Sequence, residues 1–468
     1  AQALAPLPHP PSPLSGPAQR SRGTLSRPEG SVRRGRSCPA MNSSRRGQRG
    51  QISIDRIVAL RSSVLPLYVI IRPDGAVTTS DEVSEDGCDF LTTRMHGDQI
   101  SFCSIRGDYI SVEGGEVSTK RYCGADERFA VQKMDTQYAF RARSGKFLSI
   151  LDRAPFVVLA DSAGDTEVFQ LFSLMMDGIN VGNQLEMLER TGMVSISDLL
   201  AEDELAALRG AVVECGGGGP ADGAKAAVHE VRAANLAARA GGFAGLATHP
   251  LVMQLARRVV SPALRLSDVE SCRTDADFVR KELEETTWRV VHPYSSVEYP
   301  GMVDSRASLT AMWFLDTLDE ANSTWAWAQA PLADGLHQPR LPHLSSPEEI
   351  EAVAASARPL SARSGSVWLY LGPVWMSNSV GAASFWKDHD AQTRYKHLSG
   401  QKEQTFRALA DAQRSAPQKE ELCPTVVQAT YVREFVATRF PPLPNAGLSG
   451  LCSSDEQRQT LQMLMPPP

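Results

Sequence analysis

The sequence predicts a mostly β protein with two folded domains between flexible ends. Its 468 residues exceed what one hydrophobic core usually serves. Residues 57–175 contain three similar segments of about 40 residues, a length typical of one repeated supersecondary unit. After Pro262 strand-like runs dominate, and helical runs precede them. Helices followed by a run of strands favour a sandwich or jelly roll with a helical buttress.

Composition and charge argue against some classes of function. The net charge of −6 argues against a nucleic-acid partner, and no apolar run approaches 18 residues, so no membrane span is expected. Eight cysteines lack zinc-type spacing and favour an intracellular, cytoplasmic protein with free thiols. Residues 1–51, rich in Arg, Pro and Ser, are expected to be a disordered tail, although such acid-poor composition also occurs in organellar targeting segments. Residues 441–468 are expected to be a flexible C-terminal tail.

The threefold repeat occupies residues 52–178. Its segments begin with strand-like runs at Ile57, Ile100 and Tyr138 and close on an aromatic residue at Phe90, Phe129 and Phe169. Two of them carry Gly107-Asp-Tyr-Ile-Ser and Gly145-Lys-Phe-Leu-Ser, and Pro73-Asp-Gly marks a turn. This pattern resembles the fascin-type β-trefoil, which implies a protein partner such as actin, or a glycan. The aromatic residues themselves have the spacing of a hydrophobic core.

The second half begins with a predicted strand over 184–192 and a helix after Asp198, which Ser197 or Asp198 would cap. Helical runs are predicted over 224–240 and 249–260, and strands from Leu264 onward. A further helix is predicted to start at Pro347, with Ser346 as its N-cap.

Four motifs in this half resemble the phytanoyl-CoA dioxygenase family. They are Arg190-Thr-Gly-Met-Val, Leu315-Asp-Thr-Leu-Asp-Glu-Ala-Asn-Ser-Thr-Trp, Gly365-Ser-Val-Trp-Leu-Tyr-Leu-Gly-Pro-Val-Trp-Met, and Tyr431-Val-Arg-Glu-Phe-Val. The resemblance covers 185–440, with inserts near 335–360 and 381–423. It implies a double-stranded β-helix, a jelly roll in which Fe(II) and 2-oxoglutarate support hydroxylation. The family holds its iron with two His and one carboxylate.

Carried over position by position, the resemblance assigns the three iron-ligand positions to Arg289, Val291 and Met376. Arg and Val offer no lone pair, and a thioether is a soft ligand that suits Fe(II) poorly. His292 and Asn378 are the candidate substitute ligands for the iron. Strand alternation turns His292 away from 289 and 291 unless a bulge intervenes.

The same resemblance assigns further positions. Lys387 and Arg394 are candidates for gripping a 2-oxoglutarate carboxylate. The frame of the pocket would comprise Trp288, Tyr294, Asp316, Asn322 and Trp375.

Three hypotheses follow. The first is a phytanoyl-CoA dioxygenase-like protein that has lost its iron ligands and serves as a non-catalytic binding or scaffold protein, with no cofactor. The second is an active Fe(II)/2-oxoglutarate dioxygenase with rearranged ligands, acting on a small or lipid-like substrate. The third is an actin- or glycan-binding adaptor that works through the trefoil. Retained pocket-frame residues indicate a shared fold and do not establish a shared activity. The sequence therefore leaves all three hypotheses open.

Overall fold

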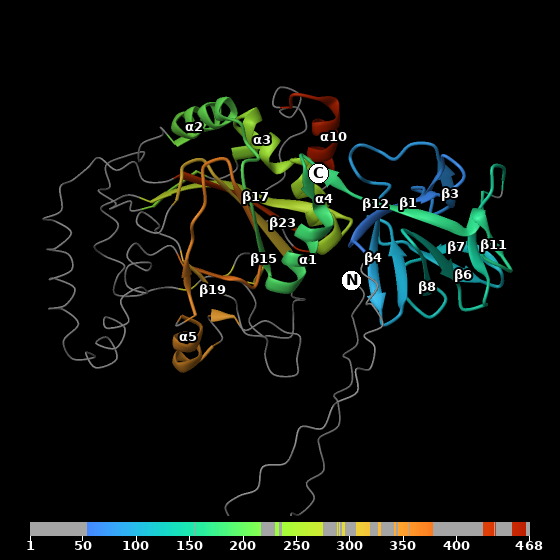
Figure 1. Cartoon of the computed structure of the whole chain (residues 1–468). Helices are drawn as coiled ribbons and strands as arrows, with labels where there is room; N and C mark the ends of the chain where they lie inside the picture. The colour runs from blue at the N-terminus through green and yellow to red at the C-terminus, as the bar shows by residue number, and fades with distance from the viewer. Residues whose placement is uncertain are drawn as a thin grey trace, which may run out of the picture. The chain divides into compact units, whose positions relative to one another are not determined.

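A computed structural model gives the structure of the chain from Ile52 onward as one compact unit. It describes residues 54–154, 156–216, 230–233, 236–274, 288, 290, 293–294, 306–318, 326–328, 341–342, 345–354, 356–377, 425–434, 436 and 452–464. These residues form large antiparallel sheets covered by a few helices, which confirms the predicted mostly β class (Figure 1). No helix in these ranges is long and apolar enough to cross a membrane.

The N-terminal part is a twelve-stranded sheet in which one pairing scheme occurs three times. Within each group of four strands the first pairs with the fourth and the second with the third. Pairing of β12 with β1 joins the last group to the first. The strands are β1 (Ile57–Ser62), β2 (Tyr68–Ile71), β3 (Val77–Ser80), β4 (Leu91–His96), β5 (Gln99–Cys103), β6 (Tyr109–Glu113), β7 (Glu116–Lys120), β8 (Phe129–Met134), β9 (Gln137–Arg141), β10 (Phe147–Ile150), β11 (Val157–Ala160) and β12 (Val168–Ser173).

Aromatic residues fill the core of these strands, as the repeat predicts. Phe129 and Phe169 are fully buried, and the rings of Phe102 and Phe140 meet edge to face with centroids 4.9 Å apart. Phe90, the aromatic residue of the first repeat, instead belongs to the core shared with the C-terminal part. The equivalent positions therefore do not all face the same core.

A buried glutamate that accepts the same set of hydrogen bonds occurs in both the second and the third repeat. Ser111 Oγ donates to Glu127 at 2.6 Å, and Ser149 Oγ donates to Glu167 at 2.6 Å. Each carboxylate also accepts the backbone N–H of the glycine three residues before it, at 2.6 and 2.7 Å. Because a buried carboxylate is costly unless it is hydrogen-bonded, these bonds fix the turn before the last strand in both of these repeats.

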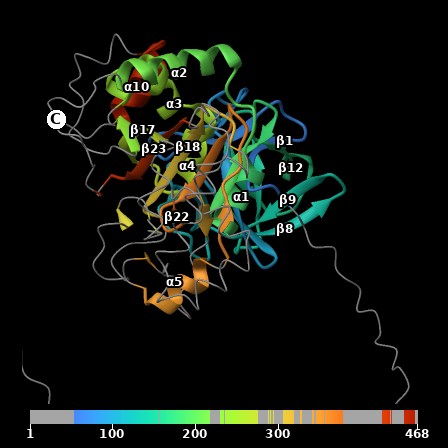
Figure 2. The same ribbon diagram turned by 90° about the vertical axis from the view of Figure 1, so that its left-hand side faces the viewer.

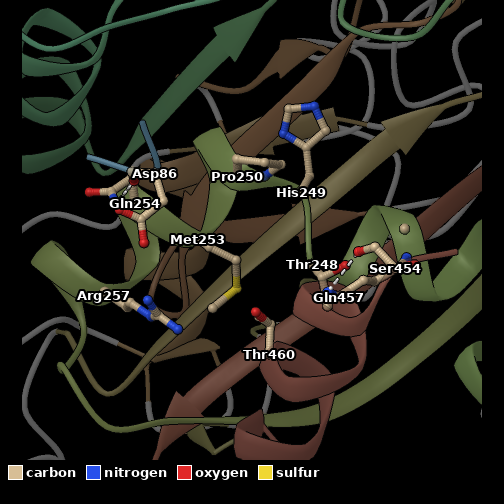
Figure 3. Close-up of a pocket in the computed structure, with 11 residues that line it drawn as sticks. Asp86, Thr248, His249, Pro250, Met253, Gln254, Arg257, Ser454, Gln457 and Thr460 are labelled. Carbon is tan, nitrogen blue, oxygen red and sulfur yellow. Dashed lines mark hydrogen bonds between the residues drawn. The ribbon is translucent and has the colours of Figure 1, made fainter. Parts of the chain in front are cut away.

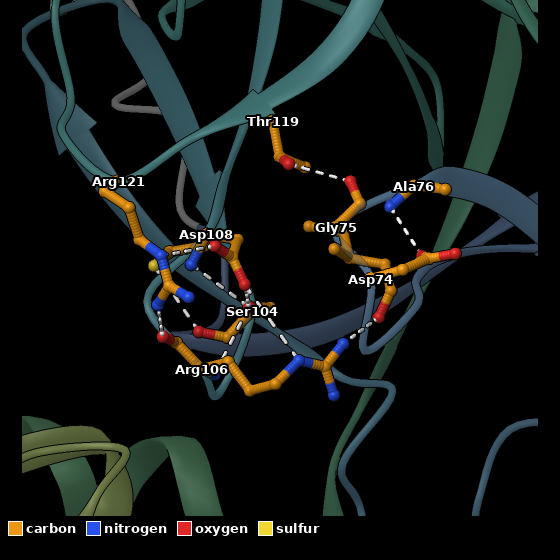
Figure 4. A network of polar contacts seen from close by, with 10 residues as sticks. Asp74, Gly75, Ala76, Ser104, Arg106, Asp108, Thr119 and Arg121 are labelled. Atoms are coloured by element: carbon orange, nitrogen blue, oxygen red, sulfur yellow. Dashed lines mark hydrogen bonds and ion pairs between the residues drawn. The ribbon is translucent and has the colours of Figure 1, made fainter.

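Polar contacts also join the first and second repeats (Figure 4). Thr119 Oγ1 donates to the carbonyl of Gly75 at 2.7 Å. Gly75 has a φ of +85°, and a Cβ there would lie 3.0 Å from Thr119 Oγ1, which explains the glycine of the Pro73-Asp-Gly turn. Nearby, the guanidinium of Arg121 lies 3.0 Å from Asp108 Oδ1 and donates to the carbonyl of Arg106.

Two further sheets face each other in the C-terminal part (Figure 2). The larger has the order β15-β21-β18-β23-β17-β16 and the smaller β20-β19-β22. Their strands are β15 (Met193–Ile196), β16 (Glu230–Ala233), β17 (Leu264–Thr274), β18 (Ser308–Phe314), β19 (Ala326–Ala328), β20 (Arg358–Pro359), β21 (Val367–Leu371), β22 (Trp375–Ser377) and β23 (Thr425–Arg433). The helices are α1 (Val181–Thr191), α2 (Glu202–Gly216), α3 (Gly241–Ala247), α4 (Pro250–Val259), α5 (Pro347–Ala354) and α10 (Asp455–Leu464).

Several elements differ from those that the sequence predicts. Residues 181–191 form α1 rather than a strand, because Asn180 caps the helix, Gly192 ends it at a φ of +75°, and Leu185 and Leu188 bury one face. Residues 230–233 form β16 by pairing with the edge of β17. In the segment expected to be a flexible tail, 455–464 form α10, whose Leu461 and Leu464 are buried. The capping of α5 by Ser346 is as predicted.

A single core runs from the N-terminal part through the helices to the larger sheet. It contains Ile57 and Phe90, residues of α1, α3 and α4, and one face of the larger sheet. Arg258 of α4 crosses this boundary, because its guanidinium donates to the carbonyls of Gly87 and Phe90 at 3.1 and 3.0 Å and to Thr92 Oγ1 at 2.6 Å. Burial lowers the pKa of Arg258 to about 10, so the group stays charged at neutral pH.

We expect Arg258→Met to lower the free energy of unfolding by about 3 kcal/mol, because buried acceptors lose a charged donor. Urea unfolding at pH 7 measures this change. Arg153→Met, which replaces an exposed arginine, is the matched control and should change stability by less than about 0.5 kcal/mol. Equal effects of the two substitutions would contradict a locking role for Arg258.

Glu167 should make stability depend on pH. Burial acts to raise its pKa, but hydrogen bonds from Ser149, Thr166 and the Gly164 N–H outweigh this effect and lower it. A lowered folded-state pKa adds stability above the ordinary value of 4.5, and this stability is lost as the pH falls through the folded-state value. We expect Glu167→Gln to cost about 1–2 kcal/mol at pH 7 and progressively less below about pH 4.5.

Urea unfolding of this variant over the acid range checks the prediction, with the exposed Glu116→Gln as control. A cost that stays constant from pH 7 down to pH 3 would contradict it.

Candidate functional site

The candidate site lies on the inner face of the larger sheet. Side chains alternate between the two faces of a strand. On β18, Leu309, Ala311 and Trp313 pack in the core beneath the helices, whereas Met312 and Phe314 belong to a separate cluster. This second cluster also contains Met376 of the smaller sheet, so it fills the space between the two sheets.

Strand register gives this inner face a polar half and an apolar half. One row across the sheet reads Met193, Tyr370, Thr310, Thr430, Asp268, and the next reads Ser195, Trp368, Met312, Gln428, Glu270. The polar residues gather on β23 and β17, and Thr310 Oγ1 lies 3.1 Å from Thr430 Oγ1. Asp268 is only 7% exposed, and it follows a register shift after Leu266 that sets its face.

Met376, the predicted counterpart of the second iron-binding histidine, packs in the apolar half. It is 5% exposed and shares its cluster with Met312, Phe314 and Tyr370. Met376 pairs with Trp327 on the adjacent strand, and the ring centroids of Trp327 and Trp368 are 6.1 Å apart. Its surroundings are therefore those of a hydrophobic packing residue.

Three of the predicted frame residues come together on the other face of the smaller sheet. Trp288, Tyr294 and Trp375 belong to one buried cluster, in which the Trp288 and Trp375 rings are 6.3 Å apart. The hydroxyl of Tyr294 accepts the N–H of Ala307 at 2.9 Å. A Cβ at Gly372 would lie 2.0 Å from the Tyr294 ring, so this packing requires glycine. These residues hold the smaller sheet in place and lie outside the inner face.

Asp316, a further predicted frame residue, does not belong to that cluster and instead connects α2, β18 and β23. One carboxylate oxygen lies 3.1 Å from Arg209 Nε, and the other accepts the N–H of Thr425 at 2.9 Å. Arg209 Nε also donates to the carbonyl of Leu315 at 3.0 Å. The Leu315-Asp316 motif thus ties α2 to the end of β18 and the start of β23.

The other predicted site residues lie outside the described residues. They are Arg289, Val291, His292, Asn322, Asn378, Lys387 and Arg394. Their assignments remain predictions from the sequence.

The residues around Met376 do not fit the iron centre that the resemblance implies. Fe(II) in such a site takes imidazole and carboxylate ligands, whereas the cluster offers thioethers and aromatic rings. Across the described ranges, no group of three or more His, Cys, Asp or Glu side chains is arranged to hold a metal ion.

Sequence reasoning missed the polar half of the inner face. Its signal was present in Thr425-Val-Val-Gln-Ala-Thr, where polar residues at 428 and 430 interrupt an apolar strand with a period of two. Recognising it as one surface with Asp268 and Glu270 requires the β17·β23 register, which the sequence does not contain.

Neither a family model nor a curated protein matches this sequence. Among solved structures, HygX from Streptomyces hygroscopicus with nickel and 2-oxoglutarate bound is 14% identical, with 57% of this chain and 90% of that chain covered and a TM-score of 0.35. The non-heme alpha ketoglutarate dependent epimerase SnoN from nogalamycin biosynthesis is 15% identical, with 55% and 85% covered and a TM-score of 0.34. Likeness at this level does not place the chain in a family.

If Met376 is a packing residue, the loss of stability on replacing it should depend on the volume of the new side chain. We expect Met376→Leu to change the free energy of unfolding by less than about 1.5 kcal/mol. Met376→Ala should cost about 2–5 kcal/mol because it leaves a cavity. Chemical denaturation measures both, with the exposed Met463→Ala as control. A Met376→Leu variant as unstable as Met376→Ala would contradict a packing role.

Proposed function

We propose that this protein is a non-catalytic binding or scaffold protein. Its C-terminal part is a phytanoyl-CoA dioxygenase-like jelly roll with substituted iron ligands, and its N-terminal part is a β-trefoil interaction module. The observation that carries the proposal is the apolar packing of Met376 against Met312, Phe314 and Tyr370. An imidazole at position 376 would have to be accommodated among these groups, and a buried polar group without a partner is costly.

The burial of Trp288 and Val290 supports the same assignment. Both belong to the cluster on the outer side of the smaller sheet. The assignment of Arg and Val to positions where the family has His and Asp stays a prediction from the sequence.

The polar half of the inner face supports the proposal that the jelly roll binds a ligand without catalysing a reaction. Gln428 and Thr430 supply amide and hydroxyl groups, and the carboxylates of Asp268 and Glu270 lie on the same face. Together with Tyr370 and Trp368 they form a surface that is polar on one side and aromatic on the other. Such a division suits ligand recognition, in which a few polar groups orient a mainly apolar partner.

The threefold strand pairing supports the trefoil assignment of the N-terminal part. Its loops extend from a rigid, aromatic core, and loops on a rigid scaffold commonly carry binding. A protein or glycan partner is therefore proposed for this module.

Iron binding and 2-oxoglutarate turnover test the proposal. We expect the wild-type protein to show neither stoichiometric Fe(II) binding under anaerobic titration nor succinate release. The triple variant Arg289→His, Val291→Asp, Met376→His should gain Fe(II) binding, because it restores the family's donor set. Circular dichroism establishes that the variant is folded, and Met376→His alone is the matched control.

Two outcomes would contradict the proposal. Stoichiometric Fe(II) binding with succinate release by the wild type would establish the dioxygenase hypothesis instead. A folded triple variant with no more affinity for Fe(II) than Met376→His would contradict the assignment of positions 289, 291 and 376 to one site.

A further inference from the structure

A cavity of about 290 Å³ lies away from the jelly-roll interior, between α4 and α10. Three distant segments line it, namely the loop around Asp86, residues 245–257 from the end of α3 through α4, and residues 454–460 at the start of α10. Figure 3 shows Asp86 and Arg257 on one side, Ser454 and Gln457 on the other, and Met253 between them. The cavity thus exists only where the N-terminal part, α4 and α10 meet.

Arg257 is the first notable group in the cavity. It precedes Arg258 in the last turn of α4, yet the two arginines have different surroundings. Arg258 donates to four acceptors at the boundary between the two parts of the fold. The guanidinium of Arg257 forms no hydrogen bond or ion pair with any described residue. A cation at a helix C-terminus gains some stability from the helix dipole, but this leaves the five N–H donors of Arg257 available.

Asp86 supplies the opposite charge. Its carboxylate accepts hydrogen bonds from the Cys88 N–H at 3.0 Å and from Cys88 Sγ at 2.9 Å, and further acceptor capacity remains. Burial acts to raise the pKa of Asp86, but the bonds from Cys88 and the charge of Arg257 lower it overall. Gln254 donates its amide to the Asp86 carbonyl and so holds this loop against α4.

The opposite wall offers hydrogen-bond donors. The side-chain oxygen of Gln457 is engaged by the N–H and hydroxyl of Ser453 at 2.6 and 2.9 Å. Its NH₂ group has no acceptor among the described residues. Ser454 Oγ accepts the Gln457 N–H at 3.0 Å and retains its own hydrogen for a ligand. Thr460 adds a second hydroxyl, and Met253 provides an apolar floor.

We propose that this cavity binds a small zwitterion of the α-amino-acid class, with Arg257 on its carboxylate and Asp86 on its ammonium group. A simple anion would be repelled by Asp86 and a simple cation by Arg257, whereas a zwitterion pairs with both. The NH₂ of Gln457 and the hydroxyl of Ser454 complete the recognition of polar groups, and Met253 contacts an aliphatic side chain. The site is independent of the jelly-roll interior and of iron.

Isothermal titration of the full chain with the common L-α-amino acids, one at a time, tests this site. We expect saturable binding of at least one of them. Its matching 2-hydroxy acid, which lacks the ammonium group, and its decarboxylated amine should each bind at least about tenfold more weakly, or about 1.4 kcal/mol. Arg257→Met and Asp86→Asn should weaken the binding of the amino acid by at least the same factor.

The control Arg153→Met, at an exposed arginine, should leave the affinity unchanged. Gln457→Glu removes the NH₂ donor but keeps the oxygen that Ser453 holds, and it should also weaken binding, which provides a test if Arg257→Met is unstable by thermal unfolding. Absence of saturable binding for every amino acid up to about 10 mM would overturn the proposal. So would equal affinity for the 2-hydroxy acid or the amine, or affinity unchanged in the folded variants.

Discussion

The structure depends on α4, which lies between the N-terminal sheet and the larger C-terminal sheet. Its apolar face, with Leu251, Val252 and Leu255, is buried in the core that continues to both sides. Its Arg258 supplies donors to Gly87, Phe90 and Thr92, so the buried carbonyls of a neighbouring loop are satisfied by a residue from the other part of the chain. Because these groups cannot regain water without opening the boundary, the two parts are held as one unit.

This constraint sets what each face of the larger sheet can do. One face is occupied by α1, α3 and α4, and Tyr431 on that face donates to the Ala247 carbonyl at 2.8 Å. The opposite face packs against the smaller sheet. Its division into Thr310, Thr430 and Gln428 on one side and aromatic residues on the other follows from strand alternation and register. The polar groups of this face thus lie where packing against helices is absent.

Much of the fold could be predicted because it rests on local patterns. The strands at Ile57, Ile100 and Tyr138, the core aromatics Phe129 and Phe169, and the Ser346 cap of α5 follow from alternation, spacing and capping chemistry. The predictions that failed depend on distant partners. The segment over 230–233 becomes a strand only because β17 offers an edge, and α10 becomes ordered because Leu461 and Leu464 enter a core built elsewhere.

The sequence by itself determined the mostly β class and the threefold repeat, since each depends on residue type and spacing along the chain. Only the tertiary structure decided that Met376 is enclosed by Met312, Phe314 and Tyr370. It likewise placed Asp86 opposite the wall formed by Ser454 and Gln457. Residues so far apart in the chain meet only through sheet register and helix packing, which arise from burial of the whole core rather than from local preference.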